Sequence, residues 1–238
     1  MADLEALIFD FDGTIADSEP FHLAAFQRTF SEELGLELTE AQYRDRYLAF
    51  DDRTMVRAFL ADRGAEVEPA RFERLLEVKE AHYEALGASP RILPGAAELI
   101  RAASARWPLA VASGALEGEI RPVLEGAGLL DCFGPIVSAE MVGRGKPDPE
   151  SFLTALGRIN EALSVKIRPS GGLVLPEACL VLEDSVAGVG SGRAAGMRVL
   201  AVTNSFPREA LSGADRVVDS LEEIADTDAL ASWFREPG

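Results

Sequence analysis

The chain has 238 residues, of which 47% are hydrophobic and 26% charged, a composition typical of a folded globular protein rather than a disordered, collagenous or coiled-coil one. Its 23 basic and 40 acidic residues give a formal net charge of −17. This charge disfavours non-specific binding to nucleic acid or to an anionic membrane, because phosphates would be repelled over most of the surface. It also argues mildly against self-association at low salt, and we expect a monomer.

Two cysteines, Cys132 and Cys179, are too few for a disulfide framework or a zinc site and suit a reducing compartment. The first residues, MADLEALIFDFDGT, are acidic where a signal peptide would need basic side chains. No apolar run approaches the roughly 18 residues of a membrane span. We therefore expect a cytoplasmic protein.

The first predicted element is a strand at Leu7–Phe11, a short and nearly continuous apolar run of the kind buried on both faces of a sheet. Apolar residues then recur at helical spacing in two stretches, Phe21–Gly35 and Phe72–Gly87. Each stretch ends at a glycine suited to a C-terminal cap. Residues 17–90 are therefore predicted to form an inserted all-helical domain.

After the insertion, apolar runs alternate with helix-like stretches. The predicted strands are Leu109–Ser113, Pro135–Ser138, Leu180–Glu183, Val199–Val202 and Arg216–Val218. The predicted helices are Ala96–Arg106, Ile120–Ala127, Pro149–Leu163 and Val186–Ala195. This alternation predicts an α/β domain, residues 1–16 and 91–238, with a doubly wound parallel sheet that binds ligands at the carboxyl ends of its strands. The Pro, Ser and Gly of Arg168–Glu177 indicate a surface loop.

Two carboxylates, Asp10 and Asp12, stand at the end of the first predicted strand and lead into Gly13 and Thr14. Burying them is costly unless something pairs with them. A divalent cation such as Mg²⁺ would do so, because hard cations prefer oxygen ligands. Residues i and i+2 of a strand share a face, so both carboxylates can face one site. The alternative is an aspartate-stabilised turn, since Asp-Gly is a common turn pair.

Further polar residues follow later strands at the same predicted sheet edge. Ser113 and Gly114 present a hydroxyl and an unhindered N–H where a phosphate could rest, although small residues are common after strands. Lys146, between a glycine and a proline, offers a counter-charge to a phosphate. The adjacent acids Glu183 and Asp184 again indicate metal ligation; the alternative is a helix N-cap at Asp184 or the following serine. Four acids, one lysine and one hydroxyl at one sheet edge are more than coincidence would supply.

These motifs, in this order, resemble the four motifs of the haloacid dehalogenase-like (HAD) hydrolase superfamily: Asp10–Thr14 (DFDGT), Ser113, Gly145–Pro147 (GKP) and Glu183–Ser185 (EDS). The helical insertion resembles the C1 cap of that superfamily. The chain is similar to its branch of β-phosphoglucomutases, phosphoglycolate phosphatases and CbbY-like sugar-phosphate phosphatases. The resemblance covers essentially the whole chain and implies a Rossmann-like core that hydrolyses phosphoric monoesters.

The resemblance also implies roles for individual residues. Asp10 would be the nucleophile that forms an aspartyl-phosphate, and Asp12 would act as general acid and then as general base. The implied Mg²⁺ ligands are the carboxylates of Asp10 and Asp184 and the carbonyl oxygen of Asp12, with Glu183 close by. The phosphoryl group would be bound by Thr14, Ser113, Gly114 and Lys146.

Three residues of the insertion are candidates for substrate binding. Glu19 and His22 resemble polar cap residues near the active site of the mutase branch, and Arg53 could reach a second phosphate or a substrate carboxylate. His22 could instead be a partly buried helix residue, and Arg53 could pair with a neighbouring aspartate at the surface.

Three features depart from the pattern of the family. Ala115 stands where several relatives have a second hydroxyl, which would loosen phosphate binding. Gly190 and Gly192 lie in a predicted helix where relatives have better helix formers, and each should cost roughly 1 kcal/mol relative to alanine. The loop at Arg168–Glu177 is longer than is usual in the branch.

The leading interpretation is a Mg²⁺-dependent phosphatase acting on a small phosphorylated metabolite, a sugar phosphate or phosphoglycolate. The alternative is a β-phosphoglucomutase-like enzyme, in which the phosphoryl group passes to a sugar hydroxyl instead of water. The surroundings of Lys79, the only lysine of the insertion, match the mutase pattern poorly. A non-catalytic binding protein of the same fold is disfavoured, because the implied nucleophile, acid and metal ligands are all present.

Overall fold

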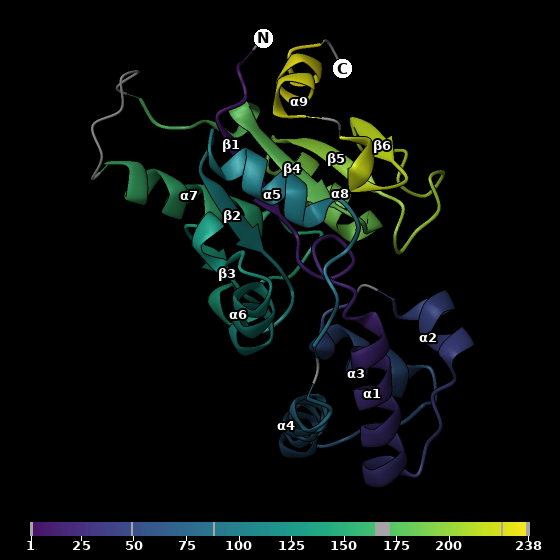
Figure 1. The fold of residues 1–238 in the computed structure, drawn as a ribbon. Coiled ribbons are helices and arrows are strands. Elements are labelled where there is room, and N and C mark those ends of the chain that lie inside the picture. Colours follow the sequence, from purple (N-terminus) through teal and green to yellow (C-terminus); the bar gives the residue numbers. More distant parts are fainter. Residues whose placement is uncertain (1, 49, 88, 165–171, 225, 237–238) are drawn as a thin grey trace. The chain divides into compact units, whose positions relative to one another are not determined.

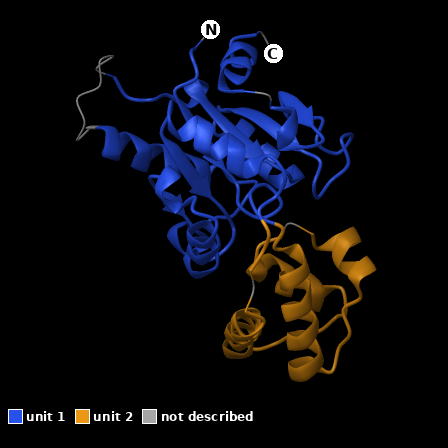
Figure 2. Ribbon diagram, in the orientation of Figure 1, with its two compact units in different colours: residues 1–16, 92–238 blue, residues 17–91 orange. Residues whose placement is uncertain are grey.

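The computed structural model describes residues 2–48, 50–87, 89–164, 172–224 and 226–236 (Figure 1). The chain divides into two compact units, residues 1–16 with 92–238 (unit 1) and residues 17–91 (unit 2) (Figure 2). The second boundary falls one residue later than the predicted one. Among the described residues, no helix is both long and apolar enough to cross a membrane.

The described part of unit 1 contains a six-stranded sheet in the order β3-β2-β1-β4-β5-β6. Its strands are β1 (Ala6–Phe9), β2 (Leu109–Ala112), β3 (Ile136–Val137), β4 (Cys179–Glu183), β5 (Arg198–Val202) and β6 (Arg216–Val218). All neighbouring strands pair in parallel, and the order reverses at β1, which lies between β2 and β4. The predicted doubly wound α/β fold is confirmed, and each of the six predicted strands is present.

The first strand ends at Phe9, two residues earlier than predicted. It ends there because the chain turns: the N–H groups of residues 15 and 16 both donate to the Phe11 carbonyl, at 2.9 and 3.0 Å. Gly13 takes a φ of 71° in this turn, a conformation that favours glycine. The Asp10 N–H still donates to a β4 carbonyl at 2.9 Å, so Asp10 stays fixed to the sheet.

Helices cover both faces of the sheet (Figure 1). The α-helices in the described part of unit 1 are α5 (Ala96–Ser104), α6 (Glu117–Gly126), α7 (Glu150–Ser164), α8 (Val186–Ala194) and α9 (Thr227–Phe234). Four short 3-10 helices are η1 (Leu130–Cys132), η2 (Ala139–Met141), η3 (Pro176–Ala178) and η4 (Leu221–Glu223). Along β1, Leu7 and Phe9 pack with apolar residues of α5, α6 and α9, whereas Ile8 packs with those of α7 and α8. Because side chains alternate along a strand, both faces of β1 are buried. Among the α-helices described in unit 1, α9, at eight residues, is the one without a counterpart in the sequence prediction.

The two glycines of α8 differ in their surroundings. A Cβ at Gly192 would lie 2.7 Å from Val199 Cγ2 and 3.4 Å from the Val181 side chain, so the absence of a side chain lets α8 approach the sheet. A Cβ at the exposed Gly190 would meet only the Pro147 side chain, at 3.5 Å. The close packing at Gly192 therefore offsets the helix stability that glycine loses relative to alanine, whereas at Gly190 the expected loss of helix stability remains.

Part of the predicted loop Arg168–Glu177, residues 168–171, lies outside the described residues. Val174 in its second half is buried, and its backbone exchanges two hydrogen bonds with the Asn160 side chain, at 2.8 and 3.0 Å. This pairing fixes the chain just before η3 and β4.

Unit 2 is helical. Its helices are α1 (Glu19–Leu34), α2 (Glu40–Arg46), α3 (Asp52–Ala61) and α4 (Pro69–Ala85). Its core contains a stacked pair, Phe30 and Phe59, with ring centroids 3.8 Å apart. Gly35 and Gly87 take φ values of 65° and 57° after α1 and α4, so both predicted C-terminal glycines are confirmed.

Candidate active site

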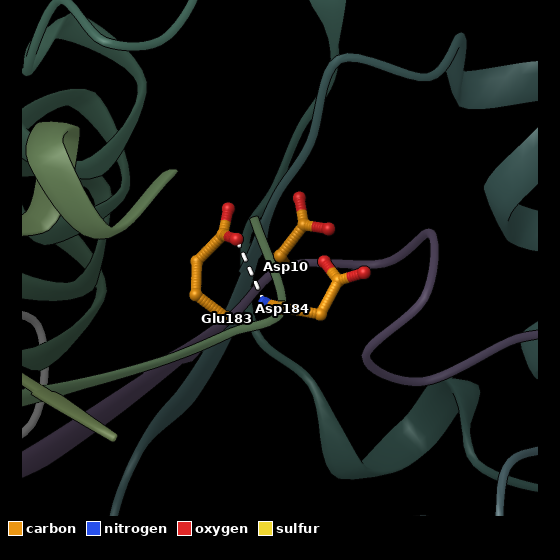
Figure 3. Close-up of side chains that lie close together, drawn as sticks. All are labelled: Asp10, Glu183 and Asp184. Atoms are coloured by element: carbon orange, nitrogen blue, oxygen red, sulfur yellow. Dashed lines mark hydrogen bonds between the residues drawn. The ribbon is translucent and has the colours of Figure 1, made fainter. Parts of the chain in front are cut away.

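Three buried carboxylates lie together at the carboxyl end of the sheet (Figure 3). Asp10 follows β1, Glu183 is the last residue of β4, and Asp184 follows it. The register of the two neighbouring strands pairs Phe9 with Leu182, which brings the residues after them side by side. One oxygen from each of the three carboxylates lies within 4.8 Å of the others.

Lys146 joins two of these acids. Its Nζ lies 2.5 Å from Asp10 Oδ1 and 2.6 Å from Glu183 Oε1. The lysine stands in the segment between η2 and α7, and its peptide bond to Pro147 is cis. The sequence predicted that these residues share one sheet edge, and the structure brings them into direct contact.

The protonation behaviour of the site follows from its burial. Burial raises the pKa of Asp10 to about 8; Lys146 opposes this shift, while Glu183 and Asp12 add to it. Burial by itself would lower the pKa of Lys146, but the carboxylates of Asp10 and Glu183 together raise it, so the ammonium stays charged. Even with Asp10 protonated, the two acids Glu183 and Asp184 set against one ammonium leave an excess of negative charge in a buried place.

This donor set fits a hard divalent cation. Its ligand atoms are carboxylate oxygens, which Mg²⁺ prefers, and a bound cation would offset the excess negative charge. The residues that could hold it are Asp10 and Asp184, with Glu183 beside them.

The carboxylate of Glu183 is held on both sides. Its Oε1 accepts from Lys146, and its Oε2 accepts from the backbone of Asp184 (Figure 3) and from the N–H and hydroxyl of Ser185, at 2.8 to 2.9 Å. A Cβ at Gly188 would overlap this carboxylate, so only glycine leaves room for it. Ser185 also caps α8 by accepting from the Gly188 N–H at 3.0 Å. The N-cap expected at 184 or 185 is thus Ser185, and Asp184 is left for the acid cluster.

The remaining predicted residues of unit 1 border the cluster. Ser113 Oγ lies 3.4 Å from Asp12 Oδ2, and Thr14 Oγ1 lies 3.5 Å from Asp184 Oδ1. Gly114 is exposed directly after Ser113 at the end of β2. Side chains of the first motif therefore lie beside both the segment after β2 and the acid after β4.

The three candidates in unit 2 have partners within that unit. Glu19 accepts a hydrogen bond from the Tyr43 hydroxyl at 2.6 Å. His22 is buried and packs against Tyr83, with ring centroids 4.6 Å apart. Both arms of the Arg53 guanidinium bond Glu73, at 2.6 and 2.8 Å. The surface partner of Arg53 is therefore this glutamate rather than a neighbouring aspartate, and the roles of all three candidates toward a substrate stay predictions.

Two residues at the site were not predicted, Asn204 and Ser205. They follow β5 at the same sheet edge. Asn204 Nδ2 donates to the Gly13 carbonyl at 2.7 Å, and Ser205 Oγ donates to Asp184 Oδ2. The available signal was their position, since polar residues directly after a predicted strand of this sheet belong at its ligand-binding edge.

Comparisons with known proteins agree with this geometry. Residues 4–196 match the model of a hydrolase family described as haloacid dehalogenase-like hydrolase. The chain is 32% identical over 235 residues to Protein CbbY of Rhodobacter capsulatus, covering 94% of this chain and 96% of that protein. It is 31% identical to hexitol phosphatase A of Escherichia coli, covering 94% of each. Its fold is similar to a crystal structure of CbbY from Rhodobacter sphaeroides in complex with xylulose-(1,5)bisphosphate, with a TM-score of 0.80, 27% identity and coverage of 95% of this chain and 99% of that one.

Proposed function

The chain belongs to the haloacid dehalogenase-like hydrolase family, as the sequence motifs implied, and we propose that it is a Mg²⁺-dependent phosphatase of small sugar phosphates. The observation that carries the proposal is the contact of Lys146 with both Asp10 and Glu183 beside Asp184. A nucleophilic carboxylate and a phosphate ester repel each other. A site that opposes this repulsion with a largely buried lysine and a set of metal-ligating oxygens suits phosphoryl transfer.

In the proposed reaction, a carboxylate oxygen of Asp10 attacks phosphorus and the bond to the ester oxygen breaks. Asp12 donates its proton to the leaving oxygen, which departs as an alcohol. Asp12 then takes a proton from water, whose oxygen attacks the phosphorus of the aspartyl-phosphate. Inorganic phosphate leaves and Asp10 is regenerated as a carboxylate.

Other residues bind the phosphoryl group and the cation. Lys146 would neutralise phosphoryl oxygens, and Thr14, Ser113 and the N–H of Gly114 would donate hydrogen bonds to them. The carboxylates of Asp10 and Asp184 and the carbonyl oxygen of Asp12 would hold Mg²⁺, with Glu183 beside them. When bound, Mg²⁺ supplies positive charge that stabilises the transferring phosphoryl group.

The names of two relatives support a sugar phosphate as the substrate class. One relative is named a hexitol phosphatase, and another binds xylulose-(1,5)bisphosphate in its crystal structure. We propose that unit 2 acts as a cap that selects the sugar, with Glu19, His22 and Arg53 as the residues to test. The predicted monomeric state and cytoplasmic location belong to the same proposal.

The proposal is tested by phosphate release from a panel of phosphates, with and without Mg²⁺. The panel contains hexitol phosphates, xylulose 1,5-bisphosphate, phosphoglycolate and β-glucose 1-phosphate. We expect Mg²⁺-dependent release that is abolished in Asp10→Asn and retained in Asp131→Asn, an exposed aspartate of η1 that serves as the matched control. Formation of glucose 6-phosphate without free phosphate would instead identify a mutase, and release that survives Asp10→Asn would exclude the aspartyl-phosphate route.

A further inference from the structure

The segment after β5, residues 203–207, contacts the first motif and the acid after β4 at the same time. We propose that Ser205 is a positioning residue that holds Asp184 in the orientation needed to bind the cation. This inference rests on the proposed function, because it assigns a role to Ser205 through a metal ligand. It goes beyond that function because none of the four motifs lies in this segment.

The first observation is the hydrogen bond itself. Ser205 Oγ donates to Oδ2 of Asp184, while Oδ1 of the same carboxylate lies 3.5 Å from Thr14 Oγ1. A carboxylate on a short side chain can rotate about its last bond. A donor fixed to one oxygen stops that rotation and leaves the other oxygen in a defined place for a cation.

The second observation is that Ser205 is itself held in place. The preceding side chain, Asn204, donates from Nδ2 to the Gly13 carbonyl at 2.7 Å, which attaches the segment to the turn after β1. At its start, the Thr203 N–H donates to the Val218 carbonyl at the end of β6 at 3.0 Å. The backbone that leads into Ser205 is therefore anchored at two points, residues 203 and 204.

The third observation is the close approach of three segments at Gly13. This residue has a φ of 71°, and a Cβ there would overlap Asp184 Oδ2 and lie 2.7 Å from Ser205 Oγ. The turn after β1, the acid after β4 and the segment after β5 thus meet with no space between them. Such packing holds the Ser205–Asp184 pair in one arrangement.

The chemical consequence concerns metal affinity rather than the chemical step. Ser205 is assigned no contact with substrate, so it acts through Asp184 alone. Groups that orient a metal ligand in this way contribute roughly 10- to 100-fold to metal affinity. We therefore expect Ser205→Ala to weaken Mg²⁺ binding by at least about 10-fold.

The test is calorimetric titration of Mg²⁺ into the metal-free full-length protein. Ser205→Thr keeps the hydroxyl and should bind Mg²⁺ as the wild type does, whereas Ser205→Cys, with a weaker donor, should lie between the wild type and Ser205→Ala. Thr203→Val is the matched control in the same segment. It removes a hydroxyl that bonds Asp219 at 3.1 Å, outside the acid cluster, and should leave affinity unchanged.

A kinetic measurement separates positioning from a merely structural role. In Ser205→Ala the Mg²⁺ concentration for half-maximal activity should rise by the same factor as the dissociation constant, with kcat at saturating Mg²⁺ little changed. Loss of thermal stability in the metal-free protein without a change in Mg²⁺ affinity would overturn the inference. If Ser205→Ala does not fold, Ser205→Cys takes its place in the test. A Mg²⁺ affinity of Ser205→Cys equal to that of the wild type would then overturn the inference.

The design also distinguishes this inference from the proposed function. If the wild type does not bind Mg²⁺, the proposed function fails, and this inference fails with it. If the wild type binds and Asp184→Asn does not, the metal site stands, and equal affinity in Ser205→Ala then refutes only the role of Ser205.

Discussion

The ammonium of Lys146 lies between the carboxylates of Asp10 and Glu183, 2.5 Å from one and 2.6 Å from the other. The two acids come from neighbouring strands, so the strand register determines their separation. One largely buried lysine therefore pairs with two carboxylates, and its removal should affect both the charge at the proposed reaction centre and the stability of the fold.

We predict that Lys146→Met lowers kcat/KM by at least about 100-fold, the usual effect of losing one charged group that stabilises a transition state. It should also destabilise the metal-free protein by about 3 kcal/mol, because Asp10 and Glu183 would stay buried without their cation. Activity assays and urea unfolding measure the two effects. Wild-type stability in Lys146→Met would contradict the assignment of this lysine as the partner of both acids.

Substitutions in α8 should have opposite effects on stability. Gly190→Ala should stabilise the protein by roughly 0.5–1 kcal/mol, because alanine is the better helix former and the site has room. Gly192→Ala should destabilise it, because the new Cβ would press on Val199. Thermal unfolding of the two variants side by side checks the sign of each change. Stabilisation by Gly192→Ala would show that α8 can move away from the sheet.

The carboxylate of Glu150 should stabilise the protein by an amount that depends on pH. Its carboxylate accepts from the Gly143 and Arg144 N–H groups, at 2.8 and 3.1 Å, in the segment that leads to Lys146. These bonds, the one from Gly143 foremost, hold the pKa of Glu150 below its ordinary value of 4.5. Its stabilising effect is therefore present above pH 4.5 and is lost as the pH falls through the lower folded-state pKa.

Glu150→Gln should accordingly lower the melting temperature at pH 7, and the difference from the wild type should shrink at low pH. Melting curves of both proteins across this range measure it. Glu125→Gln, an exposed glutamate of α6, is the control and should show no such trend. A difference that stays constant with pH would attribute the effect to something other than the carboxylate charge.

The two cysteines should differ in reactivity. Cys179 is buried in β4, and burial raises the pKa of its thiol to about 12, with Glu5 and Glu177 adding to the shift. Because the thiolate is the reactive form, Cys179 should resist a disulfide reagent at pH 8 until the protein unfolds. Cys132, which is only partly buried, should account for native labelling, and Cys132→Ser should abolish it. Rapid labelling of native Cys132→Ser would contradict this.

Local sequence patterns were sufficient for most of the fold. The six strands were predictable because each is a short apolar run bounded by turn residues. Strand β1 begins one residue earlier than predicted, at Ala6, and ends two residues earlier, at Phe9, where the chain turns back to the Phe11 carbonyl. The sequence pattern did not predict helices α2 and α3 within the insertion. Their first residues are defined by side-chain caps at Thr39 and Asp51, which depend on local geometry more than on apolar spacing.

The partners of polar side chains were less predictable. Arg53 bonds Glu73, twenty residues along the chain, and the fully buried Lys79 pairs with Asp52 at 2.7 Å. Each of these pairs joins α3 to α4, and only the packing of those helices makes the partners adjacent. The spacing of apolar residues in one helix does not specify which residue of another helix its polar side chains will contact.

The amino-acid sequence by itself determined the fold class, the division into a sheet domain and a helical insertion, and the residues at the carboxyl ends of β1, β2 and β4. Apolar spacing and turn residues are local signals, and parallel strands necessarily present those ends at one edge. The tertiary structure alone decided that Lys146 joins Asp10 to Glu183 and that Ser205 holds Asp184. The partners in these contacts lie 21 to 136 residues apart in the chain. Strand register and close packing at glycines, rather than local conformational preference, bring these residues within hydrogen-bond distance.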